Sequence, residues 1–208
     1  MGVFEKKYDV IVVGGGHAGC EAALAAARMG ASVLQLSLYL DNTALMPCNP
    51  SIGGPAKGHL VREGSALGGE QAEAADASAM LIRRLNTSKG PAVQALRAQC
   101  DLREYAAHFT LAVQTQPNLE VHQDIVTEIW VEKGKIRGVR TRYGFTYEGR
   151  TVVLTTGTYL GGKVYIGETS FPSGPLGQVA ADELPGSLNE HGIRTGRMRT
   201  DTTPRLHY

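Results

Sequence analysis

The sequence predicts an α/β protein built on a Rossmann-type parallel sheet. Near the N-terminus, the apolar run "YDVIVVG" (8–14) is followed by the alanine-rich stretch "HAGCEAALAAARMG" (17–30) and a second apolar run, "ASVLQLS" (31–37). A short apolar run that ends in glycine is typical of a buried strand, and Gly30 suits the end of a helix. A strand, a glycine turn, a helix and a second strand within positions 8–37 form a βαβ unit with a right-handed crossover.

A second observation comes from the second half of the chain. After position 125, short apolar runs alternate with the turns Glu132-Lys133-Gly134 and Tyr143-Gly144. This pattern predicts a β-meander, which then returns to a buried strand, "TVVLTTG" (151–157). The meander therefore adds a small antiparallel layer to the parallel sheet.

Between these two regions the pattern predicts mostly helix. Pro91 is well placed for the first turn of a long helix, and apolar residues recur after it at roughly helical spacing. The expected elements are helices over 56–69, 70–85 and 91–116, and a strand over 119–124. Beyond Gly162 the pattern weakens into a segment interrupted by glycine and proline. We therefore expect one domain over 1–162 and the start of a second, incomplete insertion domain over 163–208.

Composition and charge exclude several classes of protein. The 208 residues are 42% hydrophobic and 20% charged, as in an ordinary globular protein. The net charge of +1 gives no global attraction for nucleic acid, so any such footprint has to be local. Cys20, Cys48 and Cys100 are too few and too scattered for a disulfide framework or a metal cluster, which predicts a reducing, cytoplasmic compartment. No apolar run is long enough to predict a membrane span.

The first glycine turn carries the strongest functional signal. Residues 14–19, "GGGHAG", fit the pattern G-x-G-x-x-G at the end of the first predicted strand. The first glycine permits the tight turn, the second lets the backbone approach a pyrophosphate, and the third lets helix and strand pack closely. The pattern predicts dinucleotide binding, and the alternative is a glycine turn that only packs. The candidate residues are Gly14, Gly15, Gly16, His17, Ala18 and Gly19, with the ring of His17 either bordering the ligand or serving only the turn.

The glycine turn alone does not distinguish FAD from NAD. The acidic residue expected at the end of the second strand, for the adenosine ribose, is replaced by Ser37, and Asp41 lies close enough in sequence to compensate. The β-meander favours FAD over NAD, because it is typical of the glutathione-reductase-like FAD-binding domains. In such a domain the turn that contains Thr156 and Gly157 would face the cofactor.

A second candidate site is the loop "LMPCNPSIGGPAKGHLVRE" (45–63). Pro47, Pro50 and Pro55 each lack a donor and fix φ, so the part of this stretch up to Pro55 cannot be a helix or a central strand. The loop places one thiol, that of Cys48, where it could react with a substrate. The alternative is a partly buried structural thiol, which is the common fate of a single cysteine.

Four stretches together resemble one family closely. They are "GGGHAGCEAALAAARMG", "MPCNPSIGG", "LNTSKGPAVQALRAQ" and "VVLTTGTYLGGKVYIGE", and the resemblance runs from about Tyr8 to Leu206. The family is that of the glucose-inhibited division protein A, the FAD subunit of the tRNA uridine 5-carboxymethylaminomethyl modification enzyme. This chain resembles its N-terminal region only.

The resemblance implies a reaction at the wobble uridine of certain tRNAs. It implies bound FAD, NADH as the reductant, methylenetetrahydrofolate as the one-carbon donor, a GTPase partner subunit and a homodimer. By the same resemblance, residues 14–19 cradle the FAD pyrophosphate and Val126 contacts the adenine side. Cys48 matches a cysteine that the family requires, and a thiolate can add to C6 of uracil and thereby activate C5. Carrying the one-carbon unit, or holding the neighbours of the flavin in place, are alternative roles for this thiol.

The chain also departs from the family pattern. Members of the family are much longer and usually read Thr-Gly-Thr-Pro-Pro-Arg where Asp201 and Thr203 occur here. Gly64-Ser65 stands where the family favours Ile-Asp. We therefore expect a fragment or a truncated relative, whose independent catalysis is not implied.

Two other functions fit the sequence. One is a stand-alone flavin oxidoreductase that acts on small molecules, and the other is a non-catalytic nucleotide-binding or dimerisation module. Two basic groups could contact tRNA phosphates, although charged runs are usually solvated surface. They are Arg83, Arg84, Lys89 and Arg97, and, near the end of the chain, Arg194, Arg197, Arg199 and Arg205.

Overall fold

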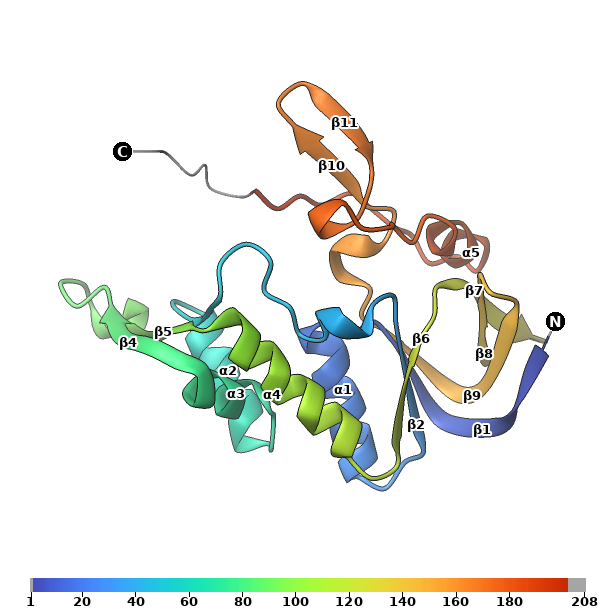
Figure 1. The fold of residues 1–208 in the computed structure, drawn as a ribbon, viewed down its shortest axis with the longest axis horizontal. Helices are drawn as coiled ribbons and strands as arrows, with labels where there is room; N and C mark the ends of the chain where they lie inside the picture. Colours follow the sequence, from blue (N-terminus) through green and yellow to red (C-terminus); the bar gives the residue numbers. More distant parts are fainter. Residues whose placement is uncertain (1, 202–208) are drawn as a thin grey trace.

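The computed structural model describes residues 2–201. Its main feature is a six-stranded sheet in the order β6-β2-β1-β9-β8-β7 (Figure 1). The strands are β1 (Gly2–Val13), β2 (Val33–Ser37), β6 (Leu119–Gln123), β7 (Val126–Glu132), β8 (Lys135–Thr141) and β9 (Phe145–Leu154). β6, β2, β1 and β9 run parallel, whereas β7, β8 and β9 pair in antiparallel fashion. The predicted Rossmann-type sheet with a β-meander is confirmed.

Helices cover the parallel part of this sheet. α1 (His17–Arg28) and α4 (Leu102–Thr115) lie side by side over the face that carries Val12 and Val33 (Figure 1). Over the opposite face, α5 (Leu184–Glu190) packs Leu184 and Leu188 into the cluster of Tyr8 and Val126. All five residues of β2 are buried, as expected for a central parallel strand covered on both faces.

The meander and the return strand share one element. We predicted a separate strand over 151–157, but β9 is continuous from Phe145 to Leu154. β9 pairs with β1 along both of its halves, with Val152 opposite Ile11, and its first half pairs on the other side with β8, with Tyr147 opposite Val139. One strand thus joins the antiparallel layer to the parallel sheet.

The middle of the chain differs most from the sequence-based expectation. It contains a second, three-stranded antiparallel sheet in the order β3-β5-β4, with two short helices. The elements are β3 (Ser51–Gly53), α2 (Lys57–Ala66), α3 (Gln71–Ser78), β4 (Ala79–Leu85) and β5 (Ala95–Cys100).

The two long helices predicted over 70–85 and 91–116 are therefore wrong in part. The first ends at Ser78 and continues as β4, and Pro91 opens only a single 3₁₀ turn, Pro91–Val93, before β5. α4 begins after Asp101, whose carboxylate accepts hydrogen bonds from the backbone N–H groups of Arg103 (2.8 Å) and Glu104 (2.9 Å). This capping residue lies inside the predicted helix and marks its true start.

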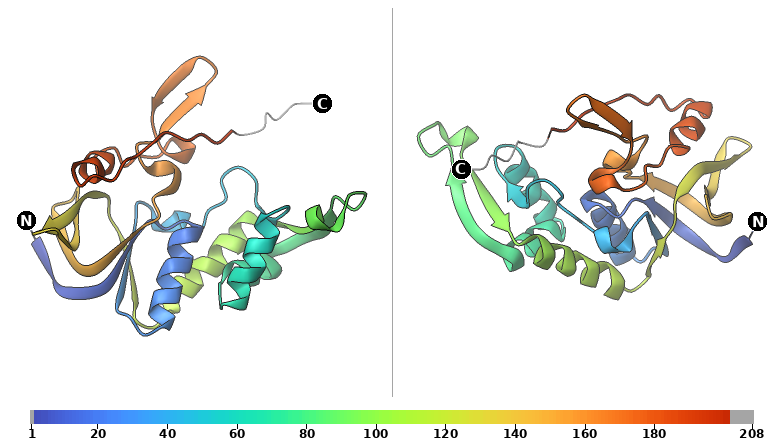
Figure 2. Two further views of the ribbon diagram at one scale, coloured as in Figure 1. Left: turned by 180° about the vertical axis from the view of Figure 1, so that it is seen from behind. Right: turned by 45° about the horizontal axis from the view of Figure 1, so that its top comes forward.

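The remainder of the chain follows β9. A hairpin of β10 (Lys163–Ile166) and β11 (Thr169–Pro172) projects away from the main sheet, and the β4–β5 ribbon extends at the far end from the meander (Figure 2). Further 3₁₀ turns are Leu40–Asn42, Gly157–Tyr159 and Pro175–Gly177. The domain boundary at residue 162 stays a prediction. Among the described residues, no helix is both long and apolar enough to cross a membrane.

Candidate nucleotide-binding site

The glycine turn lies at the carboxyl edge of the parallel strands, where β1, β2 and β9 end together. Gly14 N–H donates to Leu36 O (2.8 Å), and Thr155 N–H donates to Val13 O (2.9 Å), so the ends of the three strands are tied to one another. A cavity of about 160 Å³ opens above them. Residues that line it include Gly14, Gly15, Gly16, Ser37, Tyr39, Asn42, Asp124, Val126, Thr155, Thr156, Gly157 and Tyr159. This is the edge at which α/β folds bind ligands.

Three glycines of the turn are required by close contacts. Gly14 has φ +124°, and a Cβ there would lie 2.4 Å from Thr155 O. A Cβ on Gly19 would lie 2.0 Å from Gly14 O, so the start of α1 can pack directly on the turn. A Cβ on Gly15 would lie 2.5 Å from Ser37 Oγ. The backbone at Gly15 therefore presents no side chain at the point where the turn meets the end of β2.

The N-terminus of α1 supplies hydrogen-bond donors to the same cavity. Gly16 is the N-cap residue, and no side chain caps the helix there. The first N–H groups of a helix have no partner within the helix, and the helix dipole makes this end positive. Since Gly16 also lines the cavity, these donors are available to an anionic group.

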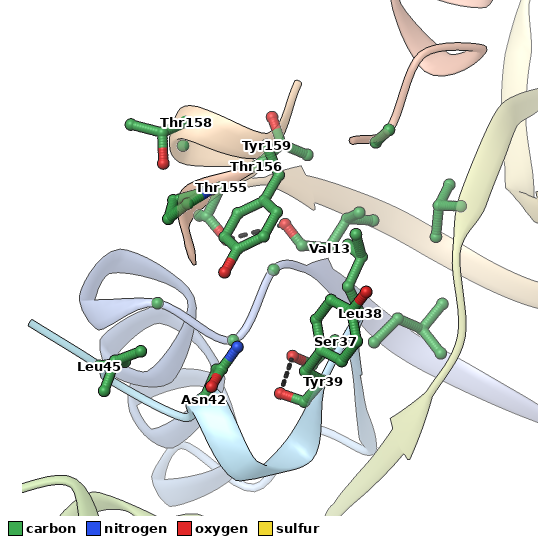
Figure 3. Close-up of a pocket in the computed structure, with 18 of the residues that line it drawn as sticks. Val13, Ser37, Leu38, Tyr39, Asn42, Leu45, Thr155, Thr156, Thr158 and Tyr159 are labelled. Atoms are coloured by element: carbon green, nitrogen blue, oxygen red, sulfur yellow. Dashed lines mark hydrogen bonds between the residues drawn. The ribbon is translucent and has the colours of Figure 1, made fainter. Parts of the chain in front are cut away.

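One wall of the cavity comes from the end of β2. Ser37 is buried, and its hydroxyl donates to Tyr39 O (3.0 Å), as Figure 3 shows. Asp41, which we expected to replace the missing acidic residue, is exposed and does not line the cavity. The acidic residue that lines the cavity is instead Asp124, which directly follows β6.

Asp124 is the residue that the sequence analysis missed. β6 pairs with β2 in parallel, and Asp124 N–H donates to Ser37 O (2.9 Å), so the two residues lie at the same edge. The Asp124 carboxylate is buried and accepts from Ile125 N–H (2.7 Å). The available signal was an acidic residue at the carboxyl end of a predicted strand, 119–124, whose neighbour in the sheet was not known.

The opposite wall comes from the end of β9 and the segment after it. Thr155, Thr156 and Tyr159 lie across the turn from Tyr39 and Asn42 (Figure 3). Gln178 joins the two walls outside the cavity, because its Oε1 accepts from both the Asn42 amide (2.8 Å) and the Tyr159 hydroxyl (2.6 Å). Thr156, Gly157 and Val126 line the cavity, as the sequence led us to expect of cofactor-contacting residues.

The side chain of His17 does not border the cavity. Its ring lies against α4, 5.5 Å from the ring of Tyr105 and 6.0 Å from that of Phe109 between centroids. Burial, together with the nearby charge of Lys57, lowers the pKa of His17 to about 4. Of the two roles that the sequence leaves open for this ring, its place against α4 favours a role in the turn. Ala18 is exposed on α1 and, like Gly19, is absent from the cavity wall.

Cys48 lies beside the cavity rather than in its wall. The loop between the 3₁₀ turn Leu40–Asn42 and β3 carries it, and its thiol is exposed. Two residues of the same loop, Leu45 and Pro47, do line the cavity. A ligand that extends out of the cavity over Pro47 would therefore reach the neighbourhood of Cys48.

A larger cavity, of about 770 Å³, lies between α1 and α2. Size alone would favour it, but its charged groups are already engaged. The Glu21 carboxylate accepts from the N–H groups of Glu70 (3.1 Å) and Gln71 (2.7 Å). The Arg28 guanidinium donates to Gly68 O (2.6 Å) and pairs with Glu70. We therefore take the smaller cavity, which receives the N-terminus of α1, as the candidate nucleotide site.

The two basic groups differ in their surroundings. Arg83, Arg84 and Lys89 are exposed on β4 and the turn after it, whereas Arg97 is half-buried and donates to Ser51 Oγ (2.9 Å). In the second group, Arg194 is exposed, Arg197 donates to Gly161 O (3.2 Å), and Arg199 pairs with Asp201 at 3.3 Å. Arg205 lies outside the described residues.

Comparison with known proteins identifies relatives over nearly the whole chain. The family model described as "Glucose inhibited division protein A" matches residues 9–208. The tRNA uridine 5-carboxymethylaminomethyl modification enzyme MnmG of Desulfitobacterium hafniense (strain DSM 10664 / DCB-2) is 56% identical over 200 residues, which are 96% of this chain and 31% of that protein. MnmG of Geotalea uraniireducens (strain Rf4) is 52% identical over 206 residues, 99% of this chain and 33% of that protein. The chain thus spans about a third of the length of these relatives.

Solved structures show the same relationship. GidA of Aquifex aeolicus, in its form II crystal, matches with a TM-score of 0.85 and 46% identity, over 88% of this chain and 31% of that one. The GidA-related protein of Thermus thermophilus has a TM-score of 0.65 at 22% identity, over 88% of this chain and 68% of that one, which shows a shared fold. From the family match and the fold together, the chain belongs to the glucose-inhibited division protein A family.

Proposed function

We propose that this chain is the FAD-binding part of an enzyme that modifies the wobble uridine of tRNA by 5-carboxymethylaminomethyl addition. The observation that carries the proposal is the turn of residues 14–19, which opens a bare helix N-terminus into a cavity at the carboxyl edge of a parallel sheet. The relatives named MnmG support the tRNA substrate, because their names state the modification of a tRNA uridine.

The residues present fit an FAD molecule. A dinucleotide needs close backbone approach at its pyrophosphate, and Gly15 offers a bare backbone there, because a Cβ at this position would collide with Ser37. Ligand pockets usually measure about 300–1,000 Å³, so a cavity of about 160 Å³ encloses only part of a dinucleotide. The remainder would extend past Pro47, toward the Cys48 loop. When bound, FAD would supply hydride-transfer chemistry.

Each wall of the cavity has a role in this proposal. Gly15, Gly16 and the first turn of α1 bind the pyrophosphate through backbone N–H groups. Ser37 and Asp124 supply the hydroxyl and carboxylate oxygens for the adenosine ribose, the task that a single acidic residue usually performs. Val126 covers the adenine side. Thr156 and Gly157 line the opposite wall and orient the part of the ligand nearest to β9.

Cys48 is the proposed catalytic residue. A nucleophilic thiol has to be accessible, and the thiol of Cys48 is exposed on a loop held by Pro47 and Pro50. As a thiolate it would add to C6 of the uracil ring, so that C5 can bond to the one-carbon electrophile; loss of the C5 proton would then break the C6–S bond, restore the C5=C6 double bond and release the thiolate. Because the thiol does not line the cavity, its removal leaves nucleotide binding intact.

The proposal also covers the co-substrates, the partners and the location of the enzyme. They are NADH as the reductant, methylenetetrahydrofolate as the one-carbon donor, a GTPase partner subunit, a homodimer and a cytoplasmic location. The exposed group Arg83, Arg84 and Lys89 is the proposed contact with tRNA phosphates, since clustered basic side chains release counterions on binding.

A chimaera tests the tRNA function directly. In it, this chain replaces the matching 200 residues of the Desulfitobacterium hafniense relative, with which it shares 56% identity. We expect the chimaera to produce modified wobble uridine, detected by mass spectrometry of tRNA nucleosides, and its Cys48→Ser form to produce none. A folded, flavin-loaded chimaera that modifies no tRNA would contradict the assignment. A fully active Cys48→Ser form would contradict the role of the thiol.

A further inference from the structure

Gln35 is an unusual residue for its place in the fold. It lies in the middle of β2, among apolar neighbours, and is 1% exposed. A buried amide is costly unless it is hydrogen-bonded, and a leucine would satisfy burial at this position without that cost. What Gln35 binds is therefore informative.

Both N–H groups of the Gln35 amide are used behind the glycine turn. Nε2 donates to Gly14 O at 3.1 Å and to Cys20 Sγ at 3.6 Å. The Cys20 thiol in turn donates to Gly15 O at 3.5 Å. The amide oxygen of Gln35 is buried and has no hydrogen-bond partner among the described residues. The side chain thus serves as a donor, and its two donor groups reach the carbonyls of Gly14 and Gly15, one directly and one through Cys20.

The position of these carbonyls decides where the next N–H groups point. In a trans peptide, the C=O of one residue and the N–H of the next lie in one plane and point in opposite directions. Gly14 O is held toward the core by Gln35, so Gly15 N–H is directed away from the core. Gly15 O is held by Cys20 and by Ala44 N–H (2.8 Å), which directs Gly16 N–H in the same way.

Glycine makes such anchoring necessary. Gly14, with φ +124°, has no Cβ to restrict its peptide planes, and Gly15 and Gly16 are likewise free to rotate. Gly14, Gly15 and Gly16 all line the cavity, whereas Gln35 and Cys20 lie behind the turn and do not. The anchors act from the core side on peptides whose other side faces the ligand space.

We propose that Gln35 is a positioning residue for nucleotide binding: through Gly14 and Cys20 it orients the N–H groups of Gly15 and Gly16 toward the phosphates of the ligand. This inference rests on the proposed nucleotide site and assigns its geometry to a side chain that never touches the ligand. Cys20, a fully buried residue of α1, is the relay between Gln35 and Gly15.

The test compares ligands with and without phosphate. Gln35→Leu removes both donors at similar size, and Gln99→Leu is the matched control, since Gln99 donates to a loop carbonyl, Pro50 O (3.0 Å), outside the cavity. We expect Gln35→Leu to weaken ADP and FAD binding about tenfold or more and to leave adenosine binding within about twofold, all measured by titration. Gln99→Leu should leave the affinity for all three ligands unchanged.

A second variant covers the case in which Gln35→Leu does not fold. Gln35→Glu keeps the size, and its carboxyl can donate only when protonated. Its affinity for ADP, relative to the unchanged chain, should rise as the pH falls, whereas a purely structural role gives no such recovery.

Three results would overturn the inference. ADP affinity could be unchanged in a folded Gln35→Leu chain, ADP and adenosine affinities could fall equally, or Gln35→Glu could show no recovery at low pH. An unchanged chain that binds neither ADP nor FAD would instead contradict the proposed function, and this inference with it.

Discussion

At the scale of single residues, the contact between Gly15 and Ser37 decides how closely the glycine turn packs against the end of β2. Gly15 is not among the glycines with positive φ, so an alanine there is compatible with the backbone. Its Cβ would nevertheless lie 2.5 Å from Ser37 Oγ and 2.9 Å from Ser37 Cβ. The turn therefore packs against β2 only because residue 15 is a glycine and has no side chain.

We expect Gly15→Ala to weaken ADP and FAD binding at least tenfold, because Ser37 or the turn has to move. The double variant Gly15→Ala, Ser37→Gly should regain part of the loss, since the second change restores the space. Isothermal titration measures both, and Gly196→Ala, where no atom lies within 4 Å of the new Cβ, is the control. Equal affinities for the Gly15→Ala and unchanged chains would refute the close-approach argument.

His17 makes stability depend on pH. Its folded-state pKa of about 4 lies below the ordinary value of 6.5, so the unfolded chain binds a proton that the folded chain does not. The free energy of unfolding therefore falls as the pH drops from 6.5 toward 4. At pH 5 it is about 2 kcal/mol lower than at neutral pH. His17→Gln should remove this part of the pH dependence. Urea unfolding at pH 7 and pH 5 measures it, and identical pH slopes for both chains would contradict a neutral, buried His17.

At the scale of elements, the start of α4 depends on one side chain. The Asp101 carboxylate accepts two backbone N–H groups of the first turn, at 2.8 and 2.9 Å. Asp101→Ala should lower the free energy of unfolding by about 1 kcal/mol, whereas Asp101→Asn retains a capping oxygen and should cost less. Denaturant unfolding of the two variants and of the unchanged chain measures these differences in the free energy of unfolding. Equal stability of both variants and the unchanged chain would mean that the cap is not needed.

α2 contains a glycine whose removal should stabilise the protein. Gly64 is exposed within this helix, and a Cβ there would meet no atom within 4 Å. Gly64→Ala should raise the free energy of unfolding by about 1 kcal/mol. Gly58 in the same helix is the matched comparison, because its Cβ would lie 3.2 Å from Leu96 O, so Gly58→Ala should gain less. A larger gain at Gly58 than at Gly64 would contradict the packing around α2.

The elements also show how far a sequence can be interpreted. β1, α1 and β2 follow from local patterns, namely apolar runs, the glycine turn and Gly30 after the helix. β4 and β5 do not, because their strands exist through pairing with each other, for example Ile82 opposite Ala98, and local patterns do not reveal that pairing. The helical pattern that continued through both was therefore misleading.

The same distinction applies to the site. Ser37, Thr156 and Gly157 could be predicted as site residues because each lies at the end of a predicted strand. In the structure all three line the cavity. Asp124 could not be assigned, because its place beside Ser37 depends on β6 pairing with β2, two strands that lie far apart in the sequence. Gln35 is invisible as a site residue for a similar reason, since its contacts lie behind the turn.

At the scale of the whole molecule, the chain spans about a third of the length of its curated relatives, and it contains the whole glycine turn of residues 14–19 with the cavity beside it. The sheet carries this turn on three parallel strands with helices on both faces, so the turn is supported from within the described residues. Nucleotide binding by the isolated chain is therefore the property on which the proposed function depends.

Titration of the purified 208-residue chain with FAD tests this property most directly, with the visible absorbance of the protein recorded beforehand. We predict a flavin spectrum, or saturable binding of one FAD per chain, that is weakened at least tenfold in Gly15→Ala and retained in Cys48→Ser. A chain that is folded by circular dichroism but binds no FAD would contradict the proposal that residues 14–19 form a working FAD site.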